Sequence, residues 1–265
     1  MIGNIAFASI GLFNWLVNFF AFYPQSGNQI EPHLVDPMIQ EVFFDSLDGV
    51  KLQAFFVPRP KSDKVVLFLH GNAGNASHRL RDAVQLANLG TNVLLLSYRG
   101  YGKSEGSPSE EGVYIDGRSA LQYIQSKFGF SLGRTVILGR SIGSAIAIDI
   151  GQNIPVGGLI LVSPFSSGRD LASVLGLSWI AWLTGEPFHS IRKVEHVLAP
   201  ALFIHGEEDE IVPLSLGRRL FERYSKEKEW KSFPGAGHND LIQHAGVSYW
   251  ETIQKFLDRV NPLKL

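Results

Sequence analysis

The chain has 265 residues, 45% of them hydrophobic and 18% charged, which is typical of a globular protein with room for one large α/β domain. Its 24 Lys and Arg residues nearly balance 25 Asp and Glu residues without a basic cluster, so we expect no nucleic-acid partner. The absence of cysteine excludes disulfides, thiolate metal sites, cysteine nucleophiles and palmitoylated anchors.

The first predicted element is an apolar N-terminal segment. No charged side chain precedes Glu31, and residues 5–23 would form a helix of about 28 Å, close to the thickness of a bilayer core. We predict that residues 1–24 are an uncleaved, single-pass membrane anchor. A signal peptide and an interfacial or packed helix are the alternatives. A signal peptide would want a basic residue near Met1, whereas the asparagines in the segment would suit a packed helix. Neither flank carries Lys or Arg, so the sequence does not predict the side of the membrane.

Residues 25–37 are polar and proline-rich, and we predict a linker leading to a catalytic domain over residues 38–265. Removal of residues 1–30 is therefore expected to leave an active domain. Within it, two strands (41–46 and 51–57) flank a turn, and short apolar runs then alternate with amphipathic stretches. The further predicted strands are 65–69, 93–96, 136–138, 159–162, 201–204 and 229–233, and the helices are 77–89, 110–127, 142–152 and 214–224. This alternation predicts a doubly wound, mostly parallel sheet.

One interval is too long for a single crossover helix. Residues 166–197 separate two predicted strands and are rich in aliphatic residues, together with Trp179 and Trp182. We predict a small helical insertion, a lid over the carboxyl ends of the strands, where open α/β sheets bind ligands. Both tryptophans are then candidate substrate-binding residues. The alternative is an ordinary sheet-covering helix with a long loop.

A candidate nucleophile lies in Gly139-Arg140-Ser141-Ile142-Gly143, which matches the pattern G-x-S-x-G. A predicted strand runs directly into this segment and a predicted helix runs directly out of it, as in a nucleophile elbow. Glycines flank the serine because a side chain would clash in so sharp a turn. The free N–H groups and the positive dipole end of the helix would stabilise an oxyanion. We predict Ser141 as the nucleophile.

A second match to the same pattern surrounds Ser104, in Gly102-Lys-Ser-Glu-Gly106. The next residues, Gly106-Ser-Pro108, prolong a loop, so no helix begins directly after Ser104. The context favours Ser141.

A serine needs a base within hydrogen-bond reach, and the base needs an acid to orient it. His238 lies in a glycine-rich loop between a predicted strand and the last predicted helix. His205 also ends a strand, but the chain turns at Gly206. Among Glu207, Glu208, Asp209 and Glu210, we select Asp209 because an apolar segment re-enters the fold directly behind it. The order Ser, Asp, His is the one used by the α/β-hydrolase fold.

An oxyanion hole is predicted from the loop that follows strand 65–69, which begins His70-Gly-Asn. We assign the backbone N–H groups of Asn72 and Ile142 as its donors. His70 is interpreted as a structural prop of this loop rather than as a proton carrier. Arg140 is either a substrate contact or a solvent-exposed residue.

These motifs together resemble the Bem46-like group of α/β-hydrolases. The similarity covers about residues 40–260 and rests on five segments: His70-Gly-Asn-Ala-Gly-Asn, Ser97-Tyr-Arg-Gly-Tyr-Gly-Lys-Ser-Glu-Gly, the elbow, His205-Gly-Glu-Glu-Asp-Glu-Ile-Val and Gly237-His-Asn-Asp. The resemblance implies the same Ser141, Asp209 and His238. Its ABHD13-type members carry a hydrophobic N-terminal anchor. Its ABHD17-type members are protein depalmitoylases with a cysteine-rich N-terminus, which this chain lacks.

The sequence therefore predicts a membrane-anchored serine hydrolase that cleaves a carboxylic ester or thioester through an acyl-enzyme, with no metal and no organic cofactor. Its expected partners are a small-molecule or lipid-like acyl substrate and the membrane. One alternative is a serine peptidase or amidase, because the same triad cleaves amides. Another is a non-catalytic hydrolase fold that acts as a membrane-tethered binding module, against which the intact triad speaks.

Overall fold

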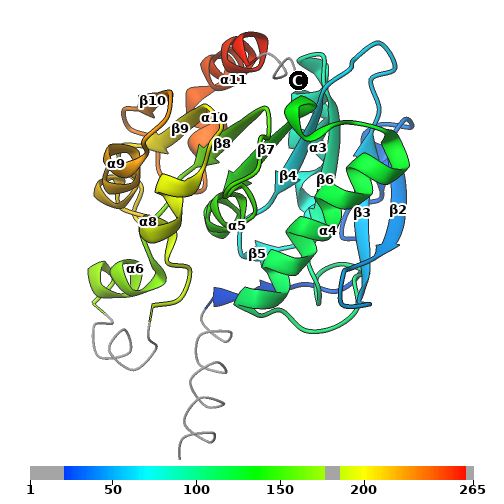
Figure 1. Cartoon of the computed structure of the whole chain (residues 1–265), viewed down its shortest axis with the longest axis horizontal. Helices are drawn as coiled ribbons and strands as arrows, with labels where there is room; N and C mark the ends of the chain where they lie inside the picture. The colour runs from blue at the N-terminus through cyan, green and yellow to red at the C-terminus, as the bar shows by residue number, and fades with distance from the viewer. Residues whose placement is uncertain (1–20, 177–185, 261–265) are drawn as a thin grey trace, which may run out of the picture.

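The computed structural model of the protein describes residues 21–176 and 186–260, which are built around an eight-stranded sheet (Figure 1). The strand order is β10-β9-β8-β7-β4-β6-β3-β2. Strand β3 is antiparallel to both of its neighbours, and every other neighbouring pair is parallel. The strands are β2 (Gln40–Asp45), β3 (Lys51–Val57), β4 (Val65–Leu69), β6 (Asn92–Ser97), β7 (Thr135–Arg140), β8 (Gly158–Val162), β9 (Ala201–Gly206) and β10 (Lys228–Phe233). The chain thus has the predicted α/β-hydrolase fold with a mostly parallel sheet.

The central strands are apolar on successive residues because helices cover both faces of the sheet. Every residue of β4, β6, β7, β8 and β9 is buried. One face packs under α4 (Glu110–Phe128), α5 (Ile142–Ile150), α8 (Ser190–Lys193) and α9 (Leu214–Arg223). The other face packs under α3 (Leu80–Asn88), α10 (Leu241–Ala245) and α11 (Val247–Arg259). Figure 1 shows these two helical layers with the sheet between them.

Local sequence explains where the helices begin and end. Ser109 caps α4 by accepting a hydrogen bond from the Gly112 N–H, and Gly129 ends it in the left-handed region at φ 75°. The predicted helix 77–89 is divided into a short 3₁₀ helix, η1 (Ala76–Arg79), and α3. Two further 3₁₀ turns, η2 (Leu132–Arg134) and η3 (Val194–His196), precede β7 and follow α8.

Part of the predicted insertion 166–197 is described. It contains α6 (Gly168–Val174), none of whose residues is buried, followed later by α8 and η3. Trp179 and Trp182 lie outside the described residues, and so does most of the predicted anchor, residues 1–20. Among the helices that the structure describes, none has the length and apolar character needed to cross a membrane.

The last residues of the predicted anchor, 22–24, are attached to the domain, so the end of the anchor was predicted too far along the chain. Strand β1 (Tyr23–Pro24) pairs in parallel with β5 (Ala73–Gly74), directly after the predicted oxyanion loop. A short helix, α2 (Pro32–Val35), lies within the predicted linker. Phe22 belongs to the hydrophobic core. At the start of the predicted linker, Gln25 and Gly27 are also bound to the domain, through backbone hydrogen bonds with Gly74 and Gly102.

Candidate active site

Ser141 occupies a strained turn between β7 and α5. Its backbone angles are φ 55° and ψ −119°, a region that non-glycine residues rarely adopt. A Cβ atom at Gly139 would lie less than 3.0 Å from the backbone of Gly143, and one at Gly143 would lie less than 3.0 Å from the carbonyl of Leu69. Both flanking positions therefore require glycine, as the sequence pattern predicts.

Strand register brings the predicted oxyanion loop beside the serine. Leu69 of β4 pairs with Gly139 of β7, so both strands end at the same edge of the sheet. A Cβ atom at Gly71 would lie 3.7 Å from the Cβ of Ser141. Ile142 is the first residue of α5, and the first N–H groups of a helix have no partner within it. The amides of Asn72 and Ile142 are thus carried by two segments that flank Ser141.

His70 fixes the peptide that bears the Asn72 N–H. Its Nδ1 lies 2.6 Å from the carbonyl oxygen of Gly71, so Nδ1 carries the proton and donates. The Gly71 carbonyl and the Asn72 N–H belong to one trans peptide and point in opposite directions. Burial lowers the pKa of His70 from 6.5 to about 4, so the ring stays neutral near pH 7. This geometry supports a structural role for His70 rather than proton transfer.

The side chains of His238 and Asp209 are in direct contact. Nδ1 of His238 lies 2.8 Å from Oδ2 of Asp209, and both residues are buried. The other carboxylate oxygen accepts hydrogen bonds from the N–H groups of Ile211 at 3.1 Å and Val212 at 2.7 Å. Burial raises the pKa of Asp209, but the hydrogen bond and positive charge of His238 and the Val212 amide outweigh it. The net pKa is lowered, and the acid is a carboxylate at neutral pH.

The neighbouring acids differ from Asp209 in exposure. Glu207, Glu208 and Glu210 are exposed. Glu207 accepts a hydrogen bond from the Ser232 hydroxyl at 2.7 Å, and Glu210 accepts one from the backbone N–H of His238 at 3.2 Å. In the described structure only Asp209 of this group meets the His238 imidazole.

His205, the other strand-end histidine, holds the turn that carries Asp209. It is fully buried, and its Nε2–H donates to the carbonyl of Val212 at 2.8 Å. Burial lowers the pKa of His205, so the ring is neutral. His205 therefore fixes the backbone that presents two amides to Asp209.

Arg140 is buried, which contradicts the interpretation of it as solvent-exposed. Arg140 is only 7% exposed, and its Nη2 donates to the carbonyl of His238 at 2.7 Å. Because Arg140 and Ser141 are adjacent, this bond holds the loop that carries His238 against the strand that ends beside Ser141. The described contact of Arg140 is thus with the His238 loop, which favours a positioning role over a substrate contact.

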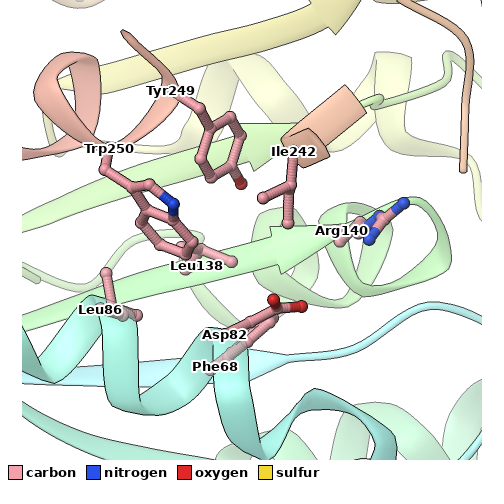
Figure 2. Close-up of a pocket in the computed structure, with 8 residues that line it drawn as sticks. All are labelled: Phe68, Asp82, Leu86, Leu138, Arg140, Ile242, Tyr249 and Trp250. Carbon is pink, nitrogen blue, oxygen red and sulfur yellow. The ribbon is translucent and has the colours of Figure 1, made fainter. Parts of the chain in front are cut away.

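A small cavity lies beside Arg140. Its volume is about 10 Å³, room for one water molecule at most. Figure 2 shows Arg140 at the end of its strand, with Asp82 from α3 and Tyr249 from α11 on the cavity walls. Burial raises the pKa of Asp82, while the charges of Arg79 and Arg140 oppose the shift. A cavity of this size on the α3 and α11 face cannot hold a substrate.

Ser104, in the second G-x-S-x-G match, has a structural role. Its hydroxyl donates to the carbonyl of Ser97 at 2.7 Å and accepts from the N–H of Gln53 at 2.8 Å. Both of these partners are backbone groups, and they fasten the loop after β6 to β3.

Sequence reasoning overlooked two tyrosines under the oxyanion loop. The hydroxyl of Tyr98 donates to the carbonyl of His70 at 2.8 Å, and that of Tyr101 donates to the carbonyl of Asn72 at 2.7 Å. Both rings are buried and pack against the His70 ring. The sequence shows that both tyrosines come just after a buried strand, but it does not show which carbonyls their hydroxyls bind. Within residues 21–176 and 186–260, no group of three or more His, Asp or Glu side chains is arranged to bind a metal.

The sequence of the chain is similar to those of known proteins. The family model described as "Serine aminopeptidase, S33" matches residues 60–193. The protein bem46 of Schizosaccharomyces pombe is 40% identical over 223 residues, which cover 79% of this chain and 73% of bem46. The α/β-hydrolase domain-containing protein WAV2 of Arabidopsis thaliana is 32% identical over 259 residues, covering 89% and 83% of the two chains.

A solved structure of similar fold is an esterase from Pyrococcus furiosus. Its TM-score is 0.73 at 21% identity, with 91% of this chain and 98% of the esterase covered. An α/β hydrolase from a Penicillium species gives a TM-score of 0.72 at 17% identity, with 84% and 98% covered. The solved structures show the fold, and the sequence relatives show the family. The chain belongs to the Bem46-like family of α/β-hydrolases.

Proposed function

We propose that the protein is a serine hydrolase that cleaves a carboxylic ester or thioester through an acyl-enzyme formed on Ser141. The observation that carries the proposal is the 2.8 Å contact between His238 Nδ1 and Asp209 Oδ2, held against the strand of Ser141 by the Arg140 hydrogen bond. With Nδ1 bound to the carboxylate, Nε2 of His238 is the nitrogen left to act as general base.

In this mechanism His238 accepts the proton of Ser141 as the serine oxygen attacks the acyl carbonyl. The amides of Asn72 and Ile142 bind the oxyanion, each contributing about 3–4 kcal/mol of transition-state stabilisation. Protonated His238 then gives its proton to the leaving alcohol or thiol, which leaves the acyl group on Ser141. His238 then takes a proton from a water molecule, whose oxygen attacks the acyl carbonyl carbon, and returns that proton to Oγ of Ser141 as the Oγ–acyl bond breaks and the carboxylic acid leaves.

The experiment that tests the proposal compares Ser141→Ala with Ser104→Ala. Both variants lose one hydroxyl from a G-x-S-x-G segment, so Ser104→Ala is a matched control. We expect Ser141→Ala to lose fluorophosphonate labelling and ester hydrolysis, and Ser104→Ala to keep both. The proposal fails if Ser141→Ala is still labelled or still hydrolyses esters at the wild-type rate.

We propose that the substrate carries a lipid-like acyl chain. The support is the apolar character of the predicted insertion, which includes Trp179 and Trp182 outside the described residues. Each CH₂ group of an acyl chain that is buried against these apolar residues contributes about 0.8 kcal/mol to the binding free energy. The rate of hydrolysis of p-nitrophenyl esters and thioesters should therefore rise with acyl chain length, from acetate toward medium chains. A steady fall beyond acetate would exclude a lipid-like substrate.

A peptidase or amidase is the second candidate, favoured by the description of the matching family model as a serine aminopeptidase. The same Ser141, His238 and Asp209 would cleave an amide by the same steps. Aminoacyl p-nitroanilides, tested beside the esters, distinguish the two activities. Faster turnover of the anilides would replace the esterase proposal with the peptidase one.

A further inference from the structure

The predicted oxyanion loop is bound along one side by a segment from the N-terminal part of the chain. The Tyr23 N–H donates to the carbonyl of Asn72 at 3.2 Å, and the Gln25 N–H donates to the carbonyl of Gly74 at 3.1 Å. These bonds form the β1–β5 pair, which lies outside the main sheet. The carbonyl of Asn72 thus receives two donors, because the Tyr101 hydroxyl also binds it.

Buried polar side chains of the same loop use the N-terminal backbone as their partner. Nδ2 of Asn75 donates to the carbonyls of Gln25 at 2.9 Å and Gly27 at 2.7 Å. Its Oδ1 meanwhile accepts from the Ser77 N–H and caps η1. The Ser77 hydroxyl accepts from the backbone N–H groups of residues 29 and 30. Asn75 and Ser77 are each 1% exposed, so no water can replace these partners without a rearrangement of the loop.

The segment is also fixed at its first described residues. Phe22 is buried in the core and meets the Phe188 ring edge-on at 6.0 Å between centroids. Gly102 N–H donates to the carbonyl of Gln25 at 2.9 Å, and Gly27 N–H donates back to the carbonyl of Gly102 at 2.7 Å. Residues 22–30 are therefore packed against the domain and hydrogen-bonded to it.

Residues 22–30 are called the N-terminal brace below. The orientation of the Asn72 N–H depends on the two peptides around Asn72. His70 holds the peptide before it through the Gly71 carbonyl, and the brace with Tyr101 holds the peptide after it through the Asn72 carbonyl. We propose that the N-terminal brace is a positioning element of the oxyanion hole, an inference that rests on the proposed function of this site.

The proposal reverses one expectation from the sequence. A free linker over residues 25–37 implies that residues 1–30 can be removed without loss of activity. The brace implies the opposite, because that deletion takes away the donors to Asn72 and Gly74 and the acceptors of Asn75. Turnover should fall even though Ser141, His238 and Asp209 are untouched.

The test uses the full-length protein with point substitutions. Tyr23→Pro removes the N–H that binds the Asn72 carbonyl, whereas Tyr23→Ala removes the same half-exposed ring and keeps the N–H. We expect kcat for an acyl ester to fall about 10- to 100-fold in Tyr23→Pro, with KM within about two-fold of wild type. Tyr23→Ala should keep the wild-type kcat.

A second variant approaches the brace from the other side. Asn75→Asp keeps an oxygen that caps η1 but replaces the donor to Gln25 and Gly27 with a carboxylate oxygen. It should show the same loss in kcat. A trifluoromethyl ketone forms an adduct that is an oxyanion, so its affinity should fall by the same factor as kcat. The pH profile of kcat should stay that of wild type, because His238 and Asp209 are not in contact with the brace in the described structure.

The outcomes separate the inference from the proposed function. Equal kcat values in Tyr23→Pro and Tyr23→Ala, with both unfolding at lower temperature, overturn the inference and make the brace a stabilising element only. If Tyr23→Pro does not fold, Asn75→Asp decides, and wild-type kcat and inhibitor binding there overturn it. Wild-type turnover that survives in Ser141→Ala instead refutes the proposed function.

Discussion

At the scale of single residues, the environment of its carboxylate distinguishes Asp209 from the neighbouring acids. Four acids stand in a row after β9, yet only Asp209 is buried, and two backbone amides donate to one of its carboxylate oxygens. Those amides belong to Ile211 and Val212, which begin the apolar segment that re-enters the fold. The sequence predicts Asp209 from that re-entry, because the buried Val212 directly behind it fixes the backbone beside its carboxylate.

Asp209→Asn is expected to lower kcat by about 10⁴-fold while the protein stays folded. The amide group can donate to Nδ1 of His238, which stabilises the tautomer with its proton on Nε2, so the ring cannot accept the Ser141 proton. Steady-state hydrolysis of a p-nitrophenyl ester measures the loss.

Glu207→Gln, Glu208→Gln and Glu210→Gln are the matched controls, because each removes one charge from the same turn. They should keep kcat near wild type, since these side chains are exposed and do not meet the imidazole in the described structure. If a glutamine variant lost as much activity as Asp209→Asn, the glutamate at that position would be the acid that orients His238.

Other residues of the site were not predictable from the sequence because their partners are distant along the chain. Arg140 binds the carbonyl of His238, 98 residues away, and Tyr101 binds the carbonyl of Asn72, 29 residues away. A pattern of residue types places a side chain at a strand end but does not name the carbonyl that it meets. The sequence therefore places Arg140 beside Ser141 but does not predict that its side chain is buried against the His238 loop.

At the scale of elements, hydrophobic periodicity predicted the sheet well. Strands β3 and β4 begin and end at the predicted residues, and β8 begins one residue early. A strand buried on both faces is apolar on every residue, so its ends are visible in the sequence. Strand β1 was missed for the opposite reason. Both of its residues are exposed, and backbone hydrogen bonds rather than apolar burial hold it.

A charged network connects three elements on the β2 and β3 side of the sheet. Arg99, in the loop after β6, binds Asp48 in the β2–β3 turn through two bonds of 2.8 Å. The same guanidinium binds Asp116 of α4 at 2.7 and 2.9 Å. The hydrogen bonds from Arg99 are the main reason that the pKa of Asp48 falls from 3.8 to about 2.

The sign of the resulting pH dependence follows from the direction of this shift. A carboxyl whose pKa is lower in the folded state stabilises the fold above its unfolded pKa and loses that contribution as the pH falls. The contribution of Asp48 is therefore complete above about pH 3.8 and is lost between pH 3.8 and about pH 2. Asp48→Asn should lower the melting temperature at pH 7 but not at pH 2.

Thermal unfolding of wild type and Asp48→Asn between pH 2 and pH 7 measures this difference. Asp45→Asn on the neighbouring β2 strand is a control that removes one charge without touching Arg99 in the described structure. A constant gap between wild type and Asp48→Asn down to pH 2 would contradict the ion pair as the cause.

At the scale of the whole molecule, the proposed catalytic residues and the start of the described chain lie at one edge of the sheet. Ser141, Asp209 and His238 all follow the carboxyl ends of strands, and β1 pairs beside the loop after β4. Figure 1 shows β1 and α6 at the same end of the molecule, while α11 lies at the opposite end. A membrane anchor in the first residues, as the sequence predicts, would therefore keep this edge of the sheet close to the membrane.

Membrane attachment by residues 1–20 is an expectation that fractionation checks. The full-length protein should remain with membranes in alkaline carbonate and should need detergent for release, because a predominantly apolar helix of about 20 residues spans a bilayer core. A chain that begins at residue 21 should not. Recovery of the full-length protein in the carbonate supernatant would show that the segment is not a membrane anchor.

The position of β1 has a practical consequence for any tag attached to this protein. A fluorescent reporter or affinity tag joined directly before residue 21 would be attached one residue from Phe22 and two from Tyr23, whose N–H binds the Asn72 carbonyl, so the proposed brace predicts that such a tag lowers turnover. A reporter joined after the C-terminus follows α11, at the far end of the molecule from β1 (Figure 1). Cellular assays that need both location and activity are therefore best made with the fusion at the C-terminal end.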